Sequence, residues 1–152
     1  MRIRSLAVLL ALAVSSAAAA KSSPLALEIT LDLTPPAARR LVSTGEGIVI
    51  DAYWYGTPST AHRREADEVG NLLLGRERHV VGPRVRSIAL TAGNVDRRRV
   101  GWLADRIVRL NVNVYSARRR YRDNILDCEA FDDRLAKAVP RLRLRCSLLR
   151  AP

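Results

Sequence analysis

The sequence has few aromatic residues, only two cysteines and two histidines, and almost no lysine. Its glycines form neither a G-x-G-x-x-G turn nor a P-loop, which excludes the usual phosphate-binding loops of nucleotide-dependent enzymes. It also lacks the G-x-S-x-G elbow of many hydrolases. Two cysteines without further ligands nearby do not make a zinc site. We therefore expect no metal and no cofactor, and binding is a better expectation than catalysis.

His62 is the one candidate around which catalysis could be built. Glu65 follows three residues later, and on a helix this spacing would place both side chains together. Such a pair can bind a metal or exchange protons, but the hydroxyls of Thr57, Ser59 and Thr60 form no nucleophile motif. A small hydrolase around His62 is therefore kept only as an alternative.

No long apolar run occurs after residue 20, so we expect no transmembrane segment in the mature chain. The first twenty residues have the order of a secretory signal peptide: basic Arg2 and Arg4, an apolar run over 6–14, and small residues up to Ala20. Cleavage after Ala20 would leave residues 21–152 as a single exported β-rich domain, periplasmic or secreted.

Basic residues are abundant, with 26 Lys+Arg against 15 Asp+Glu and a formal net charge of +11. All of them except Lys21 and Lys137 are arginine, which binds carboxylates and phosphates through a planar fork. This composition fits affinity for polyanions, and it equally fits an arginine bias of the whole proteome.

The two cysteines, Cys128 and Cys146, are expected to form a disulfide, because an even number of cysteines in an exported chain is typical of one. The alternative is a pair of free buried thiols.

Period-2 alternation of apolar and polar residues predicts most of the chain to be β-strands. Thr34, Pro35 and Gly45 mark the start and end of a helix over 35–44. Residues 57–69 are a polar insertion with possible helical turns, 132–139 a possible helical turn, and 94–105 either one helical turn or a loop. The expected strands are 24–33, 47–56, 71–81, 84–91, 106–116, 125–131 and 141–149.

The number of short strands predicts a mainly β fold, an antiparallel β-sandwich or open barrel of immunoglobulin-like or transthyretin-like size with one or two short inserted helices. The polar alternation argues against a parallel sheet covered on both faces. The alternative is an α+β fold with helices on one face of an antiparallel sheet.

The last expected strand carries a row of arginines, Arg141, Arg143 and Arg145, opposite Leu142, Leu144 and Cys146. Side chains two residues apart on a strand stand about 7 Å apart on one face. Such a row either binds an anion or faces acidic residues of a neighbouring strand, for which Glu28 and Asp32 have the matching spacing.

Two further groups combine basic and aromatic residues, a pattern suited to polyanions. Arg97 to Arg99 precede Trp102. The other group consists of Arg118, Arg119, Arg120, Arg122 and Tyr121.

Tyr53 and Tyr55 share the polar face of one expected strand with Asp51, an arrangement that suits sugar or protein contacts as well as ordinary cross-strand packing. Together these features predict an exported, non-catalytic binding module whose arginine-rich face binds an anionic glycan, a lipid phosphate or another anionic envelope component. The alternative is an inhibitor or accessory protein that docks onto an acidic exported protein. Export argues against nucleic acid as the partner.

Overall fold

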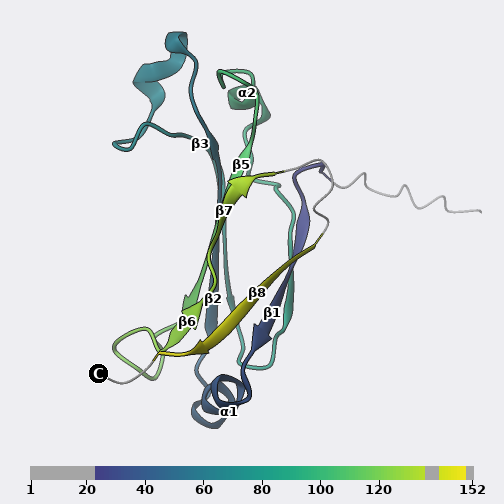
Figure 1. The fold of residues 1–152 in the computed structure, drawn as a ribbon, viewed down its shortest axis with the longest axis vertical. Coiled ribbons are helices and arrows are strands. Elements are labelled where there is room, and N and C mark those ends of the chain that lie inside the picture. The colour runs from purple at the N-terminus through teal and green to yellow at the C-terminus, as the bar shows by residue number, and fades with distance from the viewer. Residues whose placement is uncertain (1–22, 136–140, 150–152) are drawn as a thin grey trace, which may run out of the picture.

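The computed structural model describes residues 23–135 and 141–149; the expected signal peptide lies outside them. Eight strands form two four-stranded sheets that pack face to face (Figure 1). This confirms the predicted β-sandwich. None of the helices in the described ranges has the length and apolar character that crossing a bilayer requires.

Sheet A has the strand order β4-β1-β8-β6, formed by β4 (Ser87–Leu90), β1 (Leu27–Leu33), β8 (Arg141–Leu148) and β6 (Leu126–Cys128). Its central pair, β1 and β8, is parallel, whereas the other pairs are antiparallel. The apolar residues of β1 and β8 point inward, as their alternation predicts.

Sheet B has the order β3-β2-β5-β7, formed by β3 (Leu72–Val81), β2 (Ile48–Gly56), β5 (Arg109–Ser116) and β7 (Phe131–Arg134). All its pairs are antiparallel. The pairing of β2 with β3 shifts between Trp54 and Tyr55, opposite Gly75. At that glycine a Cβ atom would stand 2.6 Å from the carbonyl oxygen of Asn94, so only glycine admits this close approach.

The core lies between the two sheets and is apolar almost throughout. Trp54 is fully buried at its centre, and its Nε1 donates to the carbonyl oxygen of Leu25 at 3.4 Å. Cys128 and Cys146 face each other across β6 and β8 and form the expected disulfide, with the Cys146 side chain fully buried.

Within the described residues, the three short helices lie at the ends of the sandwich (Figure 1). Helix α1 (Pro35–Thr44) has the predicted bounds and ends at Gly45, whose φ of 66° is left-handed. The 3-10 helix η1 (Thr60–Glu65) forms part of the polar insertion. Of the two alternatives for residues 94–105, the structure has the helical turn, α2 (Arg97–Val100). The Asp96 side chain caps α2 by accepting from Arg98 N at 2.9 Å.

The helical turn expected over 132–139 is wrong for its first three residues, which belong to β7; residues 136–140 lie outside the described ranges. β7 is an edge strand held by backbone pairing to β5. An edge strand needs no apolar alternation and tolerates charged side chains, so Asp132 and Asp133 misled the prediction.

A buried carboxylate joins the two sheets at one side of the sandwich. Glu77 of β3 accepts from Thr91 Oγ1 at 2.9 Å and from the backbone nitrogens of Thr91 and Gly93 at 3.1 and 3.2 Å. Because Thr91 directly follows β4, these bonds tie the edge of sheet B to the edge of sheet A.

Candidate functional site

The outer face of sheet B carries the tyrosines that the sequence singled out. The strand register places Arg76 of β3 and Asn111 of β5 on either side of Tyr53. Tyr53 and Tyr55 are half-buried, whereas Arg76 is exposed. From Val49 to Tyr55 this face extends about 20 Å along β2, where Val49 and Asp51 are buried. The neighbouring strand β3 exposes Arg76, Arg78 and Val80 on the same face.

Asp51 organises this face from its centre. Although it lies on the outer side of the sheet, its relative exposure is only 3%. Its two carboxylate oxygens accept from Arg76 Nε at 2.8 Å and Nη2 at 2.6 Å. Oδ2 also accepts from the hydroxyls of Tyr53 at 3.2 Å and Tyr115 at 3.4 Å. One buried carboxylate therefore holds two tyrosines and an arginine in fixed positions.

The charges at this hub favour binding over proton transfer. Hydrogen bonds from Arg76 lower the pKa of Asp51, although burial opposes the shift. Burial, followed by the charge of Asp51, raises the pKa of Tyr53. At neutral pH Asp51 is therefore a weak base and Tyr53 remains a protonated donor, so neither group is tuned for acid–base catalysis.

A hollow of about 200 Å³ opens at one end of the same face. Tyr53 and Tyr55 line one side of it, and Asp67 of the polar insertion and Asn71, which precedes β3, line another. The Tyr55 hydroxyl donates to Asp132 of β7, which also borders the hollow. The insertion therefore frames the tyrosines without burying them.

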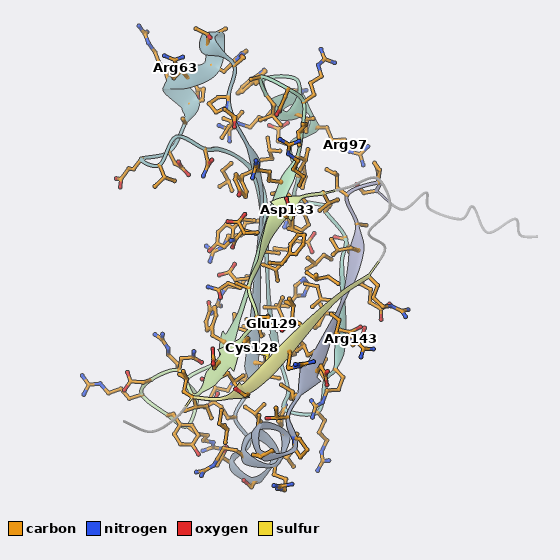
Figure 2. All side chains as sticks on the ribbon, viewed as in Figure 1. Arg63, Arg97, Cys128, Glu129, Asp133 and Arg143 are labelled. Atoms are coloured by element: carbon orange, nitrogen blue, oxygen red, sulfur yellow. A yellow bond between two sulfur atoms is a disulfide. The ribbon has the colours of Figure 1, made fainter. Side chains whose placement is uncertain are left out.

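The arginine row of β8 lies on the opposite face of the molecule, on the outer side of sheet A, where Arg143 points away from the core (Figure 2). The neighbouring strand is β1, whose Glu28 and Asp32 are the register partners of Arg141 and Arg145. Arg141 Nη2 lies 3.0 Å from Glu28 Oε2. This is the arrangement expected of a cross-strand charge ladder, and it leaves less positive charge for an anion than the sequence alone suggests.

The basic group from Arg118 to Arg122 forms the loop after β5, and its arginines are exposed. Its backbone is anchored on Glu46, a fully buried residue that follows α1. Glu46 accepts from the backbone nitrogens of Arg119 at 3.1 Å, Arg120 at 2.7 Å and Gly47 at 2.9 Å. The anchor was not predicted; its only sequence signal is a lone acid between two glycines ahead of an apolar strand.

His62 does not form the pair that its spacing with Glu65 suggested. Its ring stacks on Trp102 with centroids 4.7 Å apart, and its Nδ1 lies 3.0 Å from Ser59 Oγ. Glu65 instead lies 3.9 Å from Arg99 Nη2. Backbone dihedrals at His62 depart from helical values, which separates the two side chains. Among the described residues, no group of three potential metal ligands occurs.

Acid should destabilise the fold through its buried carboxylates. Burial would raise the pKa of Glu46, but hydrogen bonds from backbone donors outweigh burial and lower this pKa. Burial would likewise raise the pKa of Glu77, but hydrogen bonds from Thr91 help to lower it. With pKa values lowered in the folded state, the unfolded chain binds more protons as pH falls. We expect a nearly constant free energy of unfolding above about pH 5 and a steep loss below about pH 4.

Urea unfolding at several pH values would test this. The variant Glu77→Gln should show a shallower loss than the native chain between neutral and acid pH. An equally steep loss in this variant would contradict the assignment of the acid sensitivity to Glu77.

No protein family model, no curated protein and no solved structure matches the chain. Its function is therefore inferred from the geometry of the outer face of sheet B.

Proposed function

We propose that the protein is a non-catalytic, exported module that binds a glycan across the outer face of sheet B. The observation that carries the proposal is the Asp51 hub, a buried carboxylate that holds Tyr53, Tyr115 and Arg76 in place on an open face. Side chains fixed before binding lose little conformational entropy when a ligand arrives.

The chemistry of this face suits sugar rings. A sugar presents C–H groups that pack on an aromatic ring and hydroxyls that need paired donors and acceptors. Tyr53 and Tyr55 offer ring surface, and Asn111 and Asn113 lie on the same face as amide donors and acceptors. The Arg76 guanidinium lies 4.8 Å from the centroid of the Tyr53 ring, and its Nη1, which has no hydrogen-bond partner within the described ranges, adds a charged donor.

Docking onto another protein is the second candidate. Leu73 and Val80 of β3 are exposed by 42% and 43%, and they flank the same face at its two ends. Tyrosine, arginine and exposed aliphatic side chains are also found in protein interfaces. A salt-tolerant, stoichiometric complex with a protein from an envelope extract, together with no glycan binding, would favour this candidate.

Titration with neutral and acidic hexasaccharides in a calorimeter would test the glycan proposal. We expect Tyr55→Ala to weaken binding at least about tenfold, because it removes ring surface from the hollow. Arg143→Gln on sheet A is the control and should bind like the native protein. Circular dichroism would verify that each variant is folded. Failure of the native protein to bind any hexasaccharide, or equal affinity of Tyr55→Ala and native protein, would refute the proposal.

A further inference from the structure

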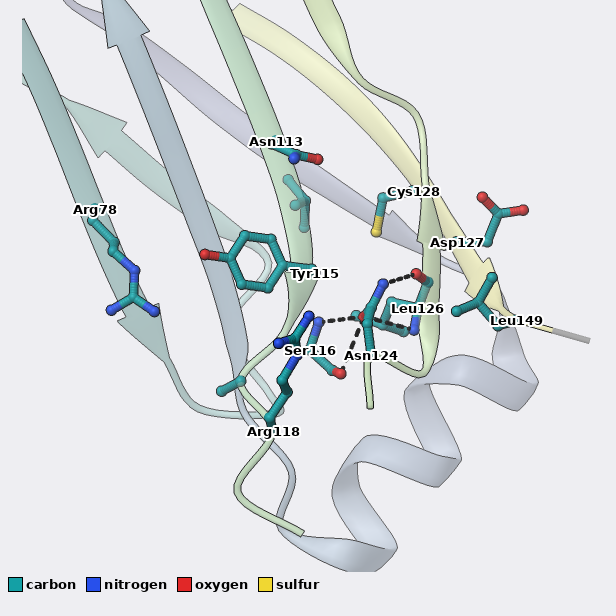
Figure 3. Close-up of a pocket in the computed structure, with 12 residues that line it drawn as sticks. Arg78, Asn113, Tyr115, Ser116, Arg118, Asn124, Leu126, Asp127, Cys128 and Leu149 are labelled. Carbon is teal, nitrogen blue, oxygen red and sulfur yellow. Dashed lines mark hydrogen bonds between the residues drawn. The ribbon is translucent and has the colours of Figure 1, made fainter. Parts of the chain in front are cut away.

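A groove of about 580 Å³ lies at the end of the outer face of sheet B, where β5 continues past β7 (Figure 3). β7 pairs with β5 only from Arg109 to Val112, so within the described ranges the rest of β5 has no strand partner on that side. Residues 113–118 line one wall of the groove, and Asn124, Leu126 and Cys128 line another. Its volume is in the range of small-molecule sites.

Among the described residues, two arginines from different parts of the chain line this groove. Arg78 belongs to β3 and Arg118 to the loop after β5, and both are exposed. Figure 3 shows the ring of Tyr115 between these two side chains. Neither guanidinium forms a hydrogen bond or ion pair within the part of the chain that the structure describes, so both forks are available to a ligand.

The segment that carries Arg118 is held rigidly. Asn124 Oδ1 accepts from Ser116 N at 2.8 Å and from Ser116 Oγ at 3.1 Å, while its Nδ2 donates to the carbonyl oxygen of Leu126 at 2.7 Å. On the other side of Arg118, the buried Glu46 holds the following two backbone nitrogens. The backbone that carries the Arg118 side chain is therefore constrained from both sides.

Arg118 also adopts a left-handed backbone conformation, with φ of 57°. For a residue other than glycine this conformation costs about 1 kcal/mol.

We propose that this groove binds the acidic groups of the glycan, carboxylates or sulfates, at the guanidinium groups of Arg78 and Arg118. The inference rests on the proposed function, since the sugar rings would lie on the adjoining outer face of sheet B, at Tyr53 and Tyr55. Each arginine fork can bind such an oxyanion with charge-assisted hydrogen bonds, and Tyr115 and Asn113 line the same groove with polar groups.

The acidic groups nearby leave room for this anion. Asp51 is already saturated by Arg76 and the two tyrosine hydroxyls. Asp127 also lines the groove, but its carboxylate points away from Tyr115 (Figure 3). The charge of Asp51 still acts on Arg78, but neither Arg78 nor Arg118 is paired with a carboxylate within the described ranges.

The test compares three hexasaccharides on the full protein: a heparin fragment with sulfates, an oligogalacturonate with carboxylates only, and a neutral chito-oligosaccharide. We expect Arg78→Gln and Arg118→Gly each to weaken binding of the acidic ligands about tenfold and to leave the neutral ligand unaffected. Glycine adopts the left-handed conformation of residue 118 without strain, so Arg118→Gly is expected to stay folded. Circular dichroism of the variant verifies that a loss of binding does not come from unfolding. Binding of the oligogalacturonate that is weakened in both groove variants shows that a carboxylate suffices, whereas binding of heparin without the oligogalacturonate shows that the groove requires sulfate.

Arg143→Gln removes the same charge from the opposite sheet and is the matched control. An equal loss of acidic-ligand binding in this control would show a non-specific charge effect and overturn the inference. Unchanged acidic binding in both groove variants would overturn it too, while loss of neutral binding in Tyr55→Ala would keep the proposed function intact. If the native protein binds none of the three ligands, the proposed function itself fails.

Discussion

Replacing Cys128 and Cys146 together with alanine should lower the free energy of unfolding by about 3 kcal/mol. The disulfide joins residues separated by 18 positions, and the closed loop leaves sheet A, passes through β7 in sheet B and returns with β8. Without the bond, the unfolded chain gains the conformational freedom that this loop had lost. Urea unfolding followed by the fluorescence of the buried Trp54 measures the change.

Reductant provides the control, since it cuts the same bond without changing the sequence. The native protein in excess reductant should unfold at nearly the same urea concentration as the double variant, which itself should not respond to reductant. Equal midpoints for oxidised and reduced native protein would contradict the expected contribution.

Replacing Glu46 with leucine should also lower the free energy of unfolding by about 3 kcal/mol, because three backbone donors would lose their buried acceptor. Glu46→Gln keeps one acceptor oxygen and should lose about half as much. Amide hydrogen exchange would locate the change, with faster exchange expected at the nitrogens of Arg119 and Arg120. The groove beside Arg118 should loosen in parallel.

The exposed Glu68 offers a matched control for this experiment. Glu68→Gln removes the same charge from the surface and should change the unfolding free energy by less than about 0.5 kcal/mol. A comparable loss in this control would show that net charge, rather than the buried anchor, governs stability.

Strands with one exposed and one buried face were predictable, because polar and apolar residues alternate along their sequence. β1, β2, β5 and β8 all have the predicted inner and outer sides, and the cysteine pair lies on the inner side as expected. β7 was not predictable, because its stability comes from backbone pairing with β5 and its side chains carry no apolar pattern.

The candidate site was predictable only in part. The alternation placed Tyr53, Tyr55 and Asp51 on one face, but it contains no information about which strand lies beside them. Arg76 reaches Asp51 over 25 residues of sequence, and Arg119 reaches Glu46 over 73. Such partners depend on the order of strands within the sheets, which a single sequence does not record.

The parallel neighbours β1 and β8 are the first and the last strands of the sandwich. Because β8 also separates β1 from β6, sheet A cannot be completed until nearly the whole chain has been synthesised. A nascent chain thus cannot close sheet A for most of its translation. A ribosome that stops before Arg141 releases a product with two unfinished sheet edges, a substrate for proteases rather than a smaller stable domain.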